Sequence, residues 1–267
     1  MFNTIGFIGT GTMGSAVARA AVKGAPEASI LLSNRTPAKA EALAKDLGVQ
    51  ASDNETVART CSLIFLGVKP QMMAGMLEAI APVLAARSDR FVLASMAAGL
   101  DARRIQAMAG GKYPVICFMP NTPVAVGAGV VQYYGLDATE EELDGFQALL
   151  APAGLVDRIE PAQLNAASAV SGCGPAFCSL FIEALADGGV ACGLPRDKAL
   201  AYAAQMLAGS ARMVLETGAH PGALKDAVCS PGGSTIQGVR ALEKGGLRAA
   251  AMDAVLAAYE KTQELGT

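Results

Sequence analysis

Short, almost wholly apolar runs alternate with longer amphipathic stretches along the first 160 residues. Runs of this kind predict strands, and the amphipathic stretches between several of them predict helices. Strands that are apolar on both faces are typical of a parallel sheet covered on each side by helices. The pattern therefore predicts a doubly wound α/β domain, with strands at 5–8, 30–33, 63–68, 91–95, 115–118, 130–134 and 155–159 and helices at 13–23, 37–47, 70–86 and 140–150. It leaves open whether the sheet ends in antiparallel strands.

The pattern changes at Pro161, and no convincing strand follows. Several of the later helices begin with proline, which is tolerated in the first turn because the N–H that it lacks has no partner there. The helix around 177–185 is apolar on most sides, so it needs burial all round. We therefore expect a dinucleotide-binding domain at 1–160, an all-helical domain at 161–267 and a partner subunit that covers the latter. The predicted helices lie at 162–170, 175–191, 195–216, 221–228, 234–244 and 247–265.

Composition narrows the possible partners. The chain has 267 residues, 52% of them hydrophobic, a net charge of −3 and no long basic run, so we expect no nucleic-acid partner. The N-terminal apolar run is short and no basic segment precedes it, so we expect no signal peptide. Two uncharged stretches, 113–136 and 161–182, are interrupted by proline or glycine and contain Asn and Gln. These interruptions favour a buried core or interface over a membrane span.

The cysteines and potential metal ligands are dispersed. None of the six cysteines forms a Cys-x-x-Cys pair, which predicts free thiols in a cytoplasmic protein. No cluster of Cys, His or carboxylate residues has the spacing of a metal site, so we expect no metal.

Gly9, Gly11 and Gly14 form a G-x-G-x-x-G motif between the first predicted strand and the first predicted helix. In such a turn the first glycine permits the tight bend, the second lets a pyrophosphate approach the backbone, and the third lets the helix pack on the strand. The helix N-terminus then offers unpaired N–H groups to the phosphates. The motif predicts a Rossmann domain that binds a dinucleotide. The alternative is a glycine-rich packing turn without a nucleotide.

The end of the second predicted strand indicates which dinucleotide binds. A site that prefers NAD usually has an acidic residue there, about 20 residues after the glycines, for the ribose 2′-OH. This chain has Asn34, Arg35 and Thr36 and no carboxylate. An arginine fork suits a 2′-phosphate, so we expect NADPH as the cofactor, with NADH possible. In the alternative, Arg35 is a solvated residue at the start of a helix.

Candidate acids and bases for catalysis are scarce. The single histidine, His220, lies in a Gly-Ala-His-Pro-Gly turn, where we expect a turn or cap residue rather than a general base. No lysine occurs between Lys112 and Lys198, although hydroxy-acid dehydrogenases with a helical second domain place a lysine on the helix that follows the sheet. We infer that the substrate arrives already activated, as a protonated imine does.

A second glycine-rich segment, at 229–236, opens the predicted helix at 234–244. Its backbone N–H groups offer another anion site. Because the pyrophosphate has its own turn, this site is free to hold a substrate carboxylate. The alternative is ordinary helix capping, with Ser234 or Thr235 as the N-cap.

Taken together, these segments resemble the pyrroline-5-carboxylate reductase family over essentially the whole chain. The resemblance rests on IGFIGTGTMG at 5–14, LGVKPQ at 66–71, SMAAG at 95–99, MPNTP at 119–123, SAVSGCGPAF at 168–177 and SPGGSTIQGVRALE at 230–243. It implies reduction of 1-pyrroline-5-carboxylate to L-proline by NAD(P)H, the last step of proline biosynthesis. It also implies a helical domain that interleaves with its twin in a homodimer, and dimers that can assemble into a ring. Ser234 and Cys173 depart mildly from the family, which often has threonine and serine there.

The resemblance also assigns roles to the matching residues. It implies that Thr235 acts in catalysis and that the substrate is held by Met119, Asn121, Gly233, Ser234 and Thr235, together with residues of a neighbouring subunit. Asn121 and Lys69 have simpler interpretations, as a turn amide and a surface cation. The expected cofactor-binding residues are Phe7, Ile8, Gly9, Thr10, Gly11, Thr12, Met13, Gly14, Asn34, Arg35, Thr36, Val68, Lys69, Pro70, Pro120 and Asn121.

Two other functions remain open at this point. One is a related NADPH-dependent reductase that acts on another cyclic imine or on a flavin-like cofactor, and the segment at 230–243 argues against it. The other is a nucleotide sensor without catalysis, which would keep the glycine turn but has no need for a second anion site.

Overall fold

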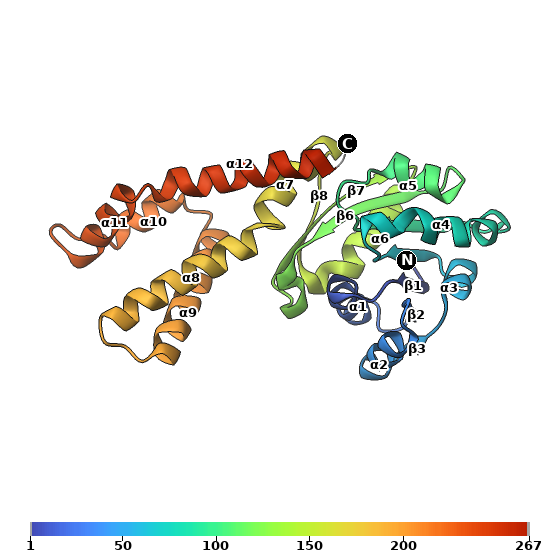
Figure 1. Ribbon diagram of the computed structural model, residues 1–267, viewed down its shortest axis with the longest axis horizontal. Coiled ribbons are helices and arrows are strands. Elements are labelled where there is room, and N and C mark those ends of the chain that lie inside the picture. Colours follow the sequence, from blue (N-terminus) through green and yellow to red (C-terminus); the bar gives the residue numbers. More distant parts are fainter. Residues whose placement is uncertain (1, 266–267) are drawn as a thin grey trace. The chain divides into compact units, whose positions relative to one another are not determined.

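The computed structural model describes residues 2–265 and divides into two compact units. The first unit comprises the chain up to Cys173 together with the segment from Ala258 onward, and the second comprises Gly174–Ala257. The first contains the sheet, and the second is helical (Figure 1).

The sheet of the first unit has eight strands in the order β3-β2-β1-β4-β5-β6-β7-β8. The strands from β3 to β6 pair in parallel, as the apolar runs predict, whereas β7 pairs antiparallel with β6. The reversal follows from the short connection between them, because a parallel crossover needs about a dozen residues or more. That connection holds only the 3-10 turn η1 (Thr122–Val126). The strands are β1 (Thr4–Ile8), β2 (Ser29–Ser33), β3 (Gln50–Ala51), β4 (Leu63–Leu66), β5 (Val92–Ser95), β6 (Val115–Pro120), β7 (Gly129–Leu136) and β8 (Gly154–Arg158).

Helices cover both faces of this sheet and create two separate cores. On one face α1 (Thr12–Gly24), α2 (Pro37–Leu47) and α6 (Glu140–Leu150) enclose an aromatic cluster. In that cluster Phe7 stacks on Phe65 with ring centroids 4.4 Å apart, and Phe146 packs beside them. On the other face α3 (Asn54–Thr60), α4 (Pro70–Ala85) and α5 (Ala102–Ala109) enclose a mainly aliphatic core. These two buried layers confirm the predicted doubly wound α/β architecture.

A buried arginine after α4 fixes the end of α3. The Arg87 side chain is only 4% exposed, and its Nη1 donates to the backbone oxygens of Ala58 and Cys61 at 2.6 and 2.8 Å. Its guanidinium lies 4.4 Å from the ring centroid of Phe91 and also bonds to Asp89. Arg87 therefore satisfies carbonyl groups at the C-terminal end of α3 that have no partner within the helix.

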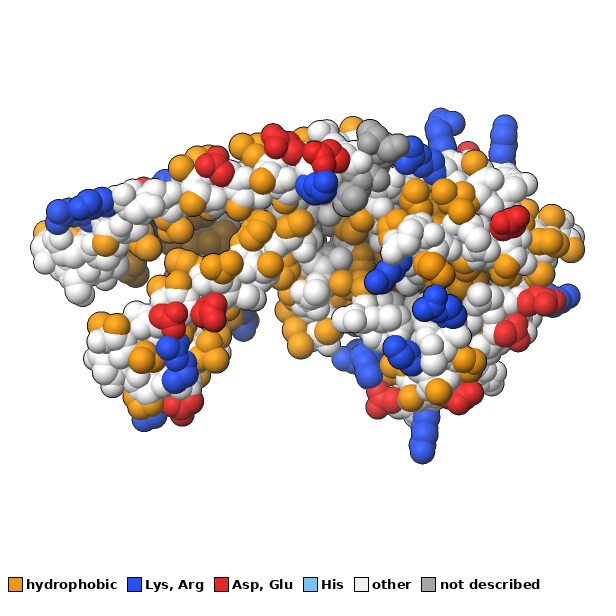
Figure 2. Space-filling view, in the orientation of Figure 1, with side chains coloured by type: hydrophobic (Ala, Val, Ile, Leu, Met, Phe, Trp, Pro, Cys, Tyr) orange, Lys and Arg blue, Asp and Glu red, His pale blue; other side chains and the backbone are white. Residues whose placement is uncertain are grey.

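The remaining helices leave much apolar surface open. Between Leu164 and residue 265 the structure contains helices and no strand. In α8, Ala186 is the single buried residue, and Leu180 is 69% exposed. The stretch Pro161–Ala191 is long and apolar enough to cross a membrane by length and composition alone. Hydrophobic side chains are visible over these helices in Figure 2. The helices are α7 (Leu164–Ser171), α8 (Gly174–Ala191), α9 (Arg196–Thr217), α10 (Pro221–Ala227), α11 (Ser234–Lys244) and α12 (Leu247–Leu265).

Candidate functional site

The glycine-rich turn after β1 has a separate physical reason for each glycine. Gly9 has φ +102°, and a Cβ there would lie 2.7 Å from the carbonyl of Gly67. A Cβ on Gly14 would lie 2.2 Å from the oxygen of Gly9, so α1 packs directly on the turn. A Cβ on Gly11 would meet nothing within 4 Å. The first and third glycines therefore serve the fold, and the second faces open space.

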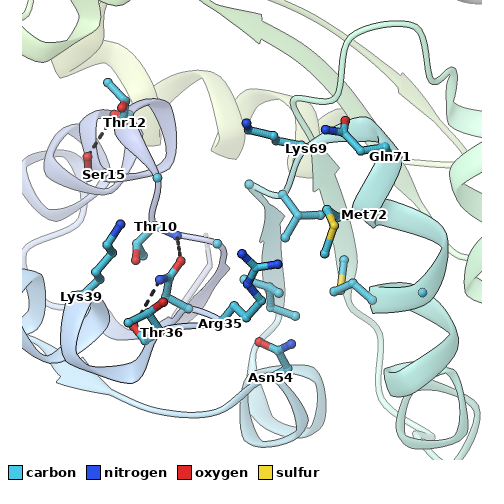
Figure 3. A pocket seen from close by; sticks show the side chains of 18 residues that line it. Thr10, Thr12, Ser15, Arg35, Thr36, Lys39, Asn54, Lys69, Gln71 and Met72 are labelled. Atoms are coloured by element: carbon cyan, nitrogen blue, oxygen red, sulfur yellow. Dashed lines mark hydrogen bonds between the residues drawn. The ribbon is translucent and has the colours of Figure 1, made fainter.

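A cavity of about 1060 Å³ lies beside this turn, at the carboxyl ends of β1, β2 and β4 (Figure 3). Open parallel sheets bind ligands at this edge. Ten of the predicted cofactor-binding residues line the cavity: Ile8, Gly9, Thr10, Gly11, Thr12, Asn34, Arg35, Thr36, Val68 and Lys69.

Other predicted residues lie outside the cavity wall. The Phe7 ring is fully buried against Phe65, Met13 packs on the same core, and Gly14 is buried in α1. Pro70 occupies the first turn of α4 without lining the cavity. These residues therefore support the glycine-rich turn by packing behind it rather than by facing the cavity.

Hydrogen bonds at the end of β2 shape one end of the cavity. The Asn34 Oδ1 accepts from the Thr10 backbone N at 3.3 Å, and its Nδ2 donates to the Thr36 oxygen at 3.2 Å. Arg35 and Lys39 are exposed, and neither forms an ion pair with any residue that the structure describes. Two cations without a protein partner thus flank a loop that Asn34 holds in place, which favours a bound anion.

Asn54, which sequence reasoning missed, lines the same end of the cavity. Its Oδ1 accepts from the Ser33 hydroxyl at 2.5 Å. Asp53 caps α3 by accepting from the Thr56 backbone N at 2.7 Å and from the Thr56 hydroxyl at 2.9 Å, and these two bonds lower the pKa of Asp53. Asp is a preferred N-cap residue, so Asp53 is a helix-start signal that would have located Asn54 at the first position of α3. The other missed lining residues are Ser15, Lys39, Gly67, Gln71, Met72, Gly75 and Met76.

A buried hydroxyl provides an independent test of what the cavity holds. Thr10 is 7% exposed, and its Oγ1 has no hydrogen-bond partner in the described part of the chain. A buried polar atom without a partner costs roughly 1–3 kcal/mol, so this hydroxyl calls for a polar group from a ligand. With the open backbone at Gly11 and the cations Arg35, Lys39 and Lys69 on the wall, the residues fit a dinucleotide with several phosphates.

Met119, Pro120 and Asn121, at the end of β6, do not line this cavity. Asn121 is 7% exposed, its Oδ1 accepts from the Val130 N at 2.8 Å, and its Nδ2 donates to the Ser171 oxygen at 3.0 Å. Gln132 donates to the Ser171 hydroxyl at 2.7 Å. The Asn121 side chain therefore joins β6, β7 and the end of α7.

Gly233, Ser234 and Thr235 open α11 in the second unit. Gly233 is the N-cap, no side chain caps this helix, and both hydroxyl side chains are exposed. The interpretation that Ser234 or Thr235 caps α11 is therefore wrong, and the first backbone N–H groups remain available. His220 instead caps α10, where its Nδ1 accepts from the Gly222 N at 3.0 Å.

Comparison with known proteins covers both halves of the chain. The family model "Pyrroline-5-carboxylate reductase dimerisation" matches residues 161–265, and "NADP oxidoreductase coenzyme F420-dependent" matches residues 4–99. The pea pyrroline-5-carboxylate reductase is 41% identical over 98% of this chain and 96% of its own. The Escherichia coli K12 enzyme of the same name is 38% identical over 99% of each chain.

Solved structures agree with these matches. The pyrroline-5-carboxylate reductase of Coxiella burnetii has a TM-score of 0.90 and 30% identity, over 100% of this chain and 99% of its own. The Plasmodium falciparum pyrroline carboxylate reductase, solved with NADP bound, has a TM-score of 0.87 and 32% identity, over 99% and 98%. Similarity of this extent, in sequence and in fold from one end to the other, makes the chain a member of the pyrroline-5-carboxylate reductase family.

Proposed function

We propose that this chain reduces 1-pyrroline-5-carboxylate to L-proline with NAD(P)H, the last step of proline biosynthesis. The observation that carries the proposal is the full-length similarity to reductases of this name. The cavity beside the glycine turn, which fits a dinucleotide on its own chemistry, supports it independently. The decisive experiment is steady-state oxidation of NADPH and of NADH with 1-pyrroline-5-carboxylate, with proline measured as the product. Absence of proline formation with either cofactor would overturn the proposal.

The first unit supplies the cofactor site. When bound, NAD(P)H supplies the hydride that adds to C5 of the C=N bond. The backbone at Gly9–Gly14 and the start of α1 hold the pyrophosphate. Asn34, Arg35 and Thr36 hold the adenosine ribose and its 2′-phosphate. The nicotinamide end is bordered by Val68, Lys69, Pro70, Met119, Pro120 and Asn121. Asn121 contributes through its hydrogen bonds, which fix the end of β6.

The start of α11, in the second unit, binds the substrate in this proposal, and Met119 and Asn121 of the first unit are proposed as substrate-binding residues as well. The Gly233 N–H already donates to the Ser230 oxygen at 3.0 Å, so the N–H groups of the first turn of α11, from Ser234 onward, bind the substrate carboxylate beside Gly233. The Thr235 hydroxyl contacts the ring nitrogen. A protonated imine is already electrophilic at C5, so the protein mainly orients the reactants. The nitrogen keeps its proton while C5 gains hydride, and the product is the neutral secondary amine. That amine then takes a proton from solvent.

Arg35 provides a test of cofactor preference. We expect Arg35→Asp to raise the KM for NADPH by on the order of 10- to 100-fold, because a lost charge-assisted bond is worth roughly 1.5–3 kcal/mol. The KM for NADH should change much less, since NADH has no 2′-phosphate. Arg59→Asp is the matched control, because Arg59 is exposed on α3 and pairs with Glu55 outside the cavity. Equal effects of Arg35→Asp on both cofactors would contradict the assignment.

Assembly is part of the proposal. We propose a cytoplasmic homodimer in which a second copy covers the apolar helices after Pro161, and dimers that assemble further into a ring. In sedimentation experiments the protein should be at least a dimer at micromolar concentration. The interface should bury well above about 2,000 Å² in total, as permanent dimers do. A monomer at that concentration would overturn this and leave Leu180 and Leu215, 69% and 79% exposed, without cover.

A further inference from the structure

Gln132, in β7, is a buried polar side chain whose surroundings suit an apolar one. It is only 6% exposed, and its Oε1 has no hydrogen-bond partner in the part of the chain that the structure describes. Tyr134, the next residue on the same face of the strand, packs in the mainly aliphatic core. A buried acceptor without a partner destabilises a fold. A residue that lowers stability in this way is typical of a functional site.

The other end of the Gln132 amide holds Ser171, the last residue of α7. The Gln132 Nε2 donates to the Ser171 hydroxyl at 2.7 Å, and that hydroxyl donates in turn to the Ala167 oxygen at 2.9 Å. The hydroxyl thus has one partner on the sheet and one on its own helix. Gln132 therefore attaches the end of α7 to β7 through the Ser171 side chain.

The Ser171 carbonyl is attached to the sheet as well. In a continuous helix it would accept from the backbone N–H four residues later, but that residue is Pro175, which has no N–H. The Asn121 Nδ2 supplies the missing donor at 3.0 Å, while the Asn121 Oδ1 accepts from the Val130 N at 2.8 Å. The position of the Asn121 side chain therefore depends on that of Ser171.

These contacts meet at the end of β6, where Met119 and Asn121 are proposed to border the nicotinamide and the substrate. Gln132 lies opposite Met119 in the pairing of β6 with β7, so both side chains leave the same face of the sheet. A misplacement of about 1 Å at a reacting centre can lower a rate about 100-fold. Small movements at the end of β6 are therefore expected to affect the rate of hydride transfer.

We propose that Gln132 is a positioning residue for hydride transfer. It holds Ser171 against the sheet, Ser171 fixes the Asn121 amide, and Asn121 fixes the end of β6. Gln132 itself touches neither the cofactor nor the substrate. The inference rests on the proposed function, because that function places Met119 and Asn121 at the reacting end.

Gln132→Met separates this role from a purely structural one, because methionine has a side chain of the same length and no amide. We expect kcat for reduction of 1-pyrroline-5-carboxylate to fall on the order of 10-fold, while the KM for NADPH stays within about threefold. The melting temperature, measured at a fixed protein concentration, should equal or exceed that of the parent, because the unpartnered acceptor is gone. A residue that only supports the fold would show the reverse.

Gln147→Met is the matched control, because Gln147, on α6, uses both ends of its amide within the fold. Its Oε1 accepts from the Tyr133 hydroxyl at 3.1 Å, and its Nε2 donates to the Val156 oxygen at 3.2 Å. This variant should have a lower melting temperature than the parent and a kcat within about twofold of it.

Ser171→Ala breaks the same contact from the other side. It should lower kcat by the same factor as Gln132→Met, and it should also lower the melting temperature, because it leaves the Gln132 Nε2 without its partner. In the double variant the melting temperature should recover. Its kcat should equal that of either single variant, because the two side chains act through one contact.

The possible outcomes separate the two proposals. If Gln132→Met has the kcat of the parent, the positioning role is overturned and the proposed function stands. If kcat and the melting temperature of Gln132→Met fall together, the methionine disturbs the strand and the positioning role is contradicted. If the two losses of kcat multiply in the double variant, the residues act separately and the role is contradicted as well. If the parent forms no proline, the proposed function fails and the positioning role fails with it.

Discussion

Replacing Thr235 with valine should lower kcat/KM for 1-pyrroline-5-carboxylate about 100-fold, by analogy with removing one positioned donor. Valine keeps the shape of the side chain and removes only the hydroxyl. That hydroxyl is proposed to accept from the protonated imine nitrogen and then to donate to the amine lone pair, which a carboxylate could not do. The NADPH affinity should stay within about threefold, because Thr235 lies outside the cofactor cavity.

Thr235→Ser is the matched control, since it retains the oxygen and should retain much of the activity. The structure removes the simplest competing explanation, because Gly233 rather than Thr235 caps α11. A Thr235→Val enzyme that works at the parent rate would show that the hydroxyl has no part in the reaction.

The second large effect is on stability. Arg87→Met should lower the free energy of unfolding by about 3 kcal/mol, because it leaves the buried carbonyls of Ala58 and Cys61 without partners. Methionine retains apolar contact with Phe91, so most of the loss comes from the hydrogen bonds. Urea unfolding at a fixed protein concentration measures the change.

Asp89→Asn separates the contribution of the Arg87–Asp89 ion pair from that of the hydrogen bonds between Arg87 and the two carbonyls. Asp89 is 63% exposed, and an exposed ion pair contributes about 0–1 kcal/mol, so this variant should be nearly as stable as the parent. Equal losses for Arg87→Met and Asp89→Asn would mean that the ion pair, rather than the carbonyl contacts, stabilises this corner.

Much of the fold was accessible from the sequence because its strands are buried on both faces. In a run such as Leu63–Leu66 every residue is apolar and buried, so a strand with one face in solvent is excluded. The two exposed residues of β3 carry no comparable signal. The antiparallel β7 was left open, although the segment between Pro120 and Gly129 is too short for a crossover helix and would have settled it.

Two short helices were missed for a different reason. Both α3 and α5 have fewer than three turns, and with two and three buried residues respectively they offer too few positions to establish a helical period. Their boundaries were nevertheless encoded, by Asp53 and Asp101 as N-caps and by Gly110 in the left-handed conformation after α5. Capping residues were thus better guides here than periodicity.

The candidate site was predictable where one segment builds it. The turn at Gly9–Gly14 and the end of β2 are local in sequence, and their residues do line one cavity. Met72, Gly75 and Met76 reach the same cavity only because α4 follows β4, the strand beside β1. Their involvement depends on sheet order, which no local pattern contains. Phe7 lies in β1, just before the glycine motif, and strand alternation turns its side chain into the core.

The close contact between Gly9, in the glycine-rich turn, and Gly67, which directly follows β4, has a consequence for how this protein can evolve. A Cβ on Gly9 would strike the main chain of Gly67, and a Cβ on Gly67 would strike the oxygen of Gly9. Because each collision is with backbone, a smaller side chain at a neighbouring position cannot relieve it, so we expect glycine to be retained at both positions. Substitutions that change which cofactor is used are therefore expected at cavity-lining side chains such as Arg35 and Lys39. Mutant libraries designed to bind other nucleotides should therefore leave Gly9 and Gly67 unchanged and vary side chains such as Arg35 and Lys39.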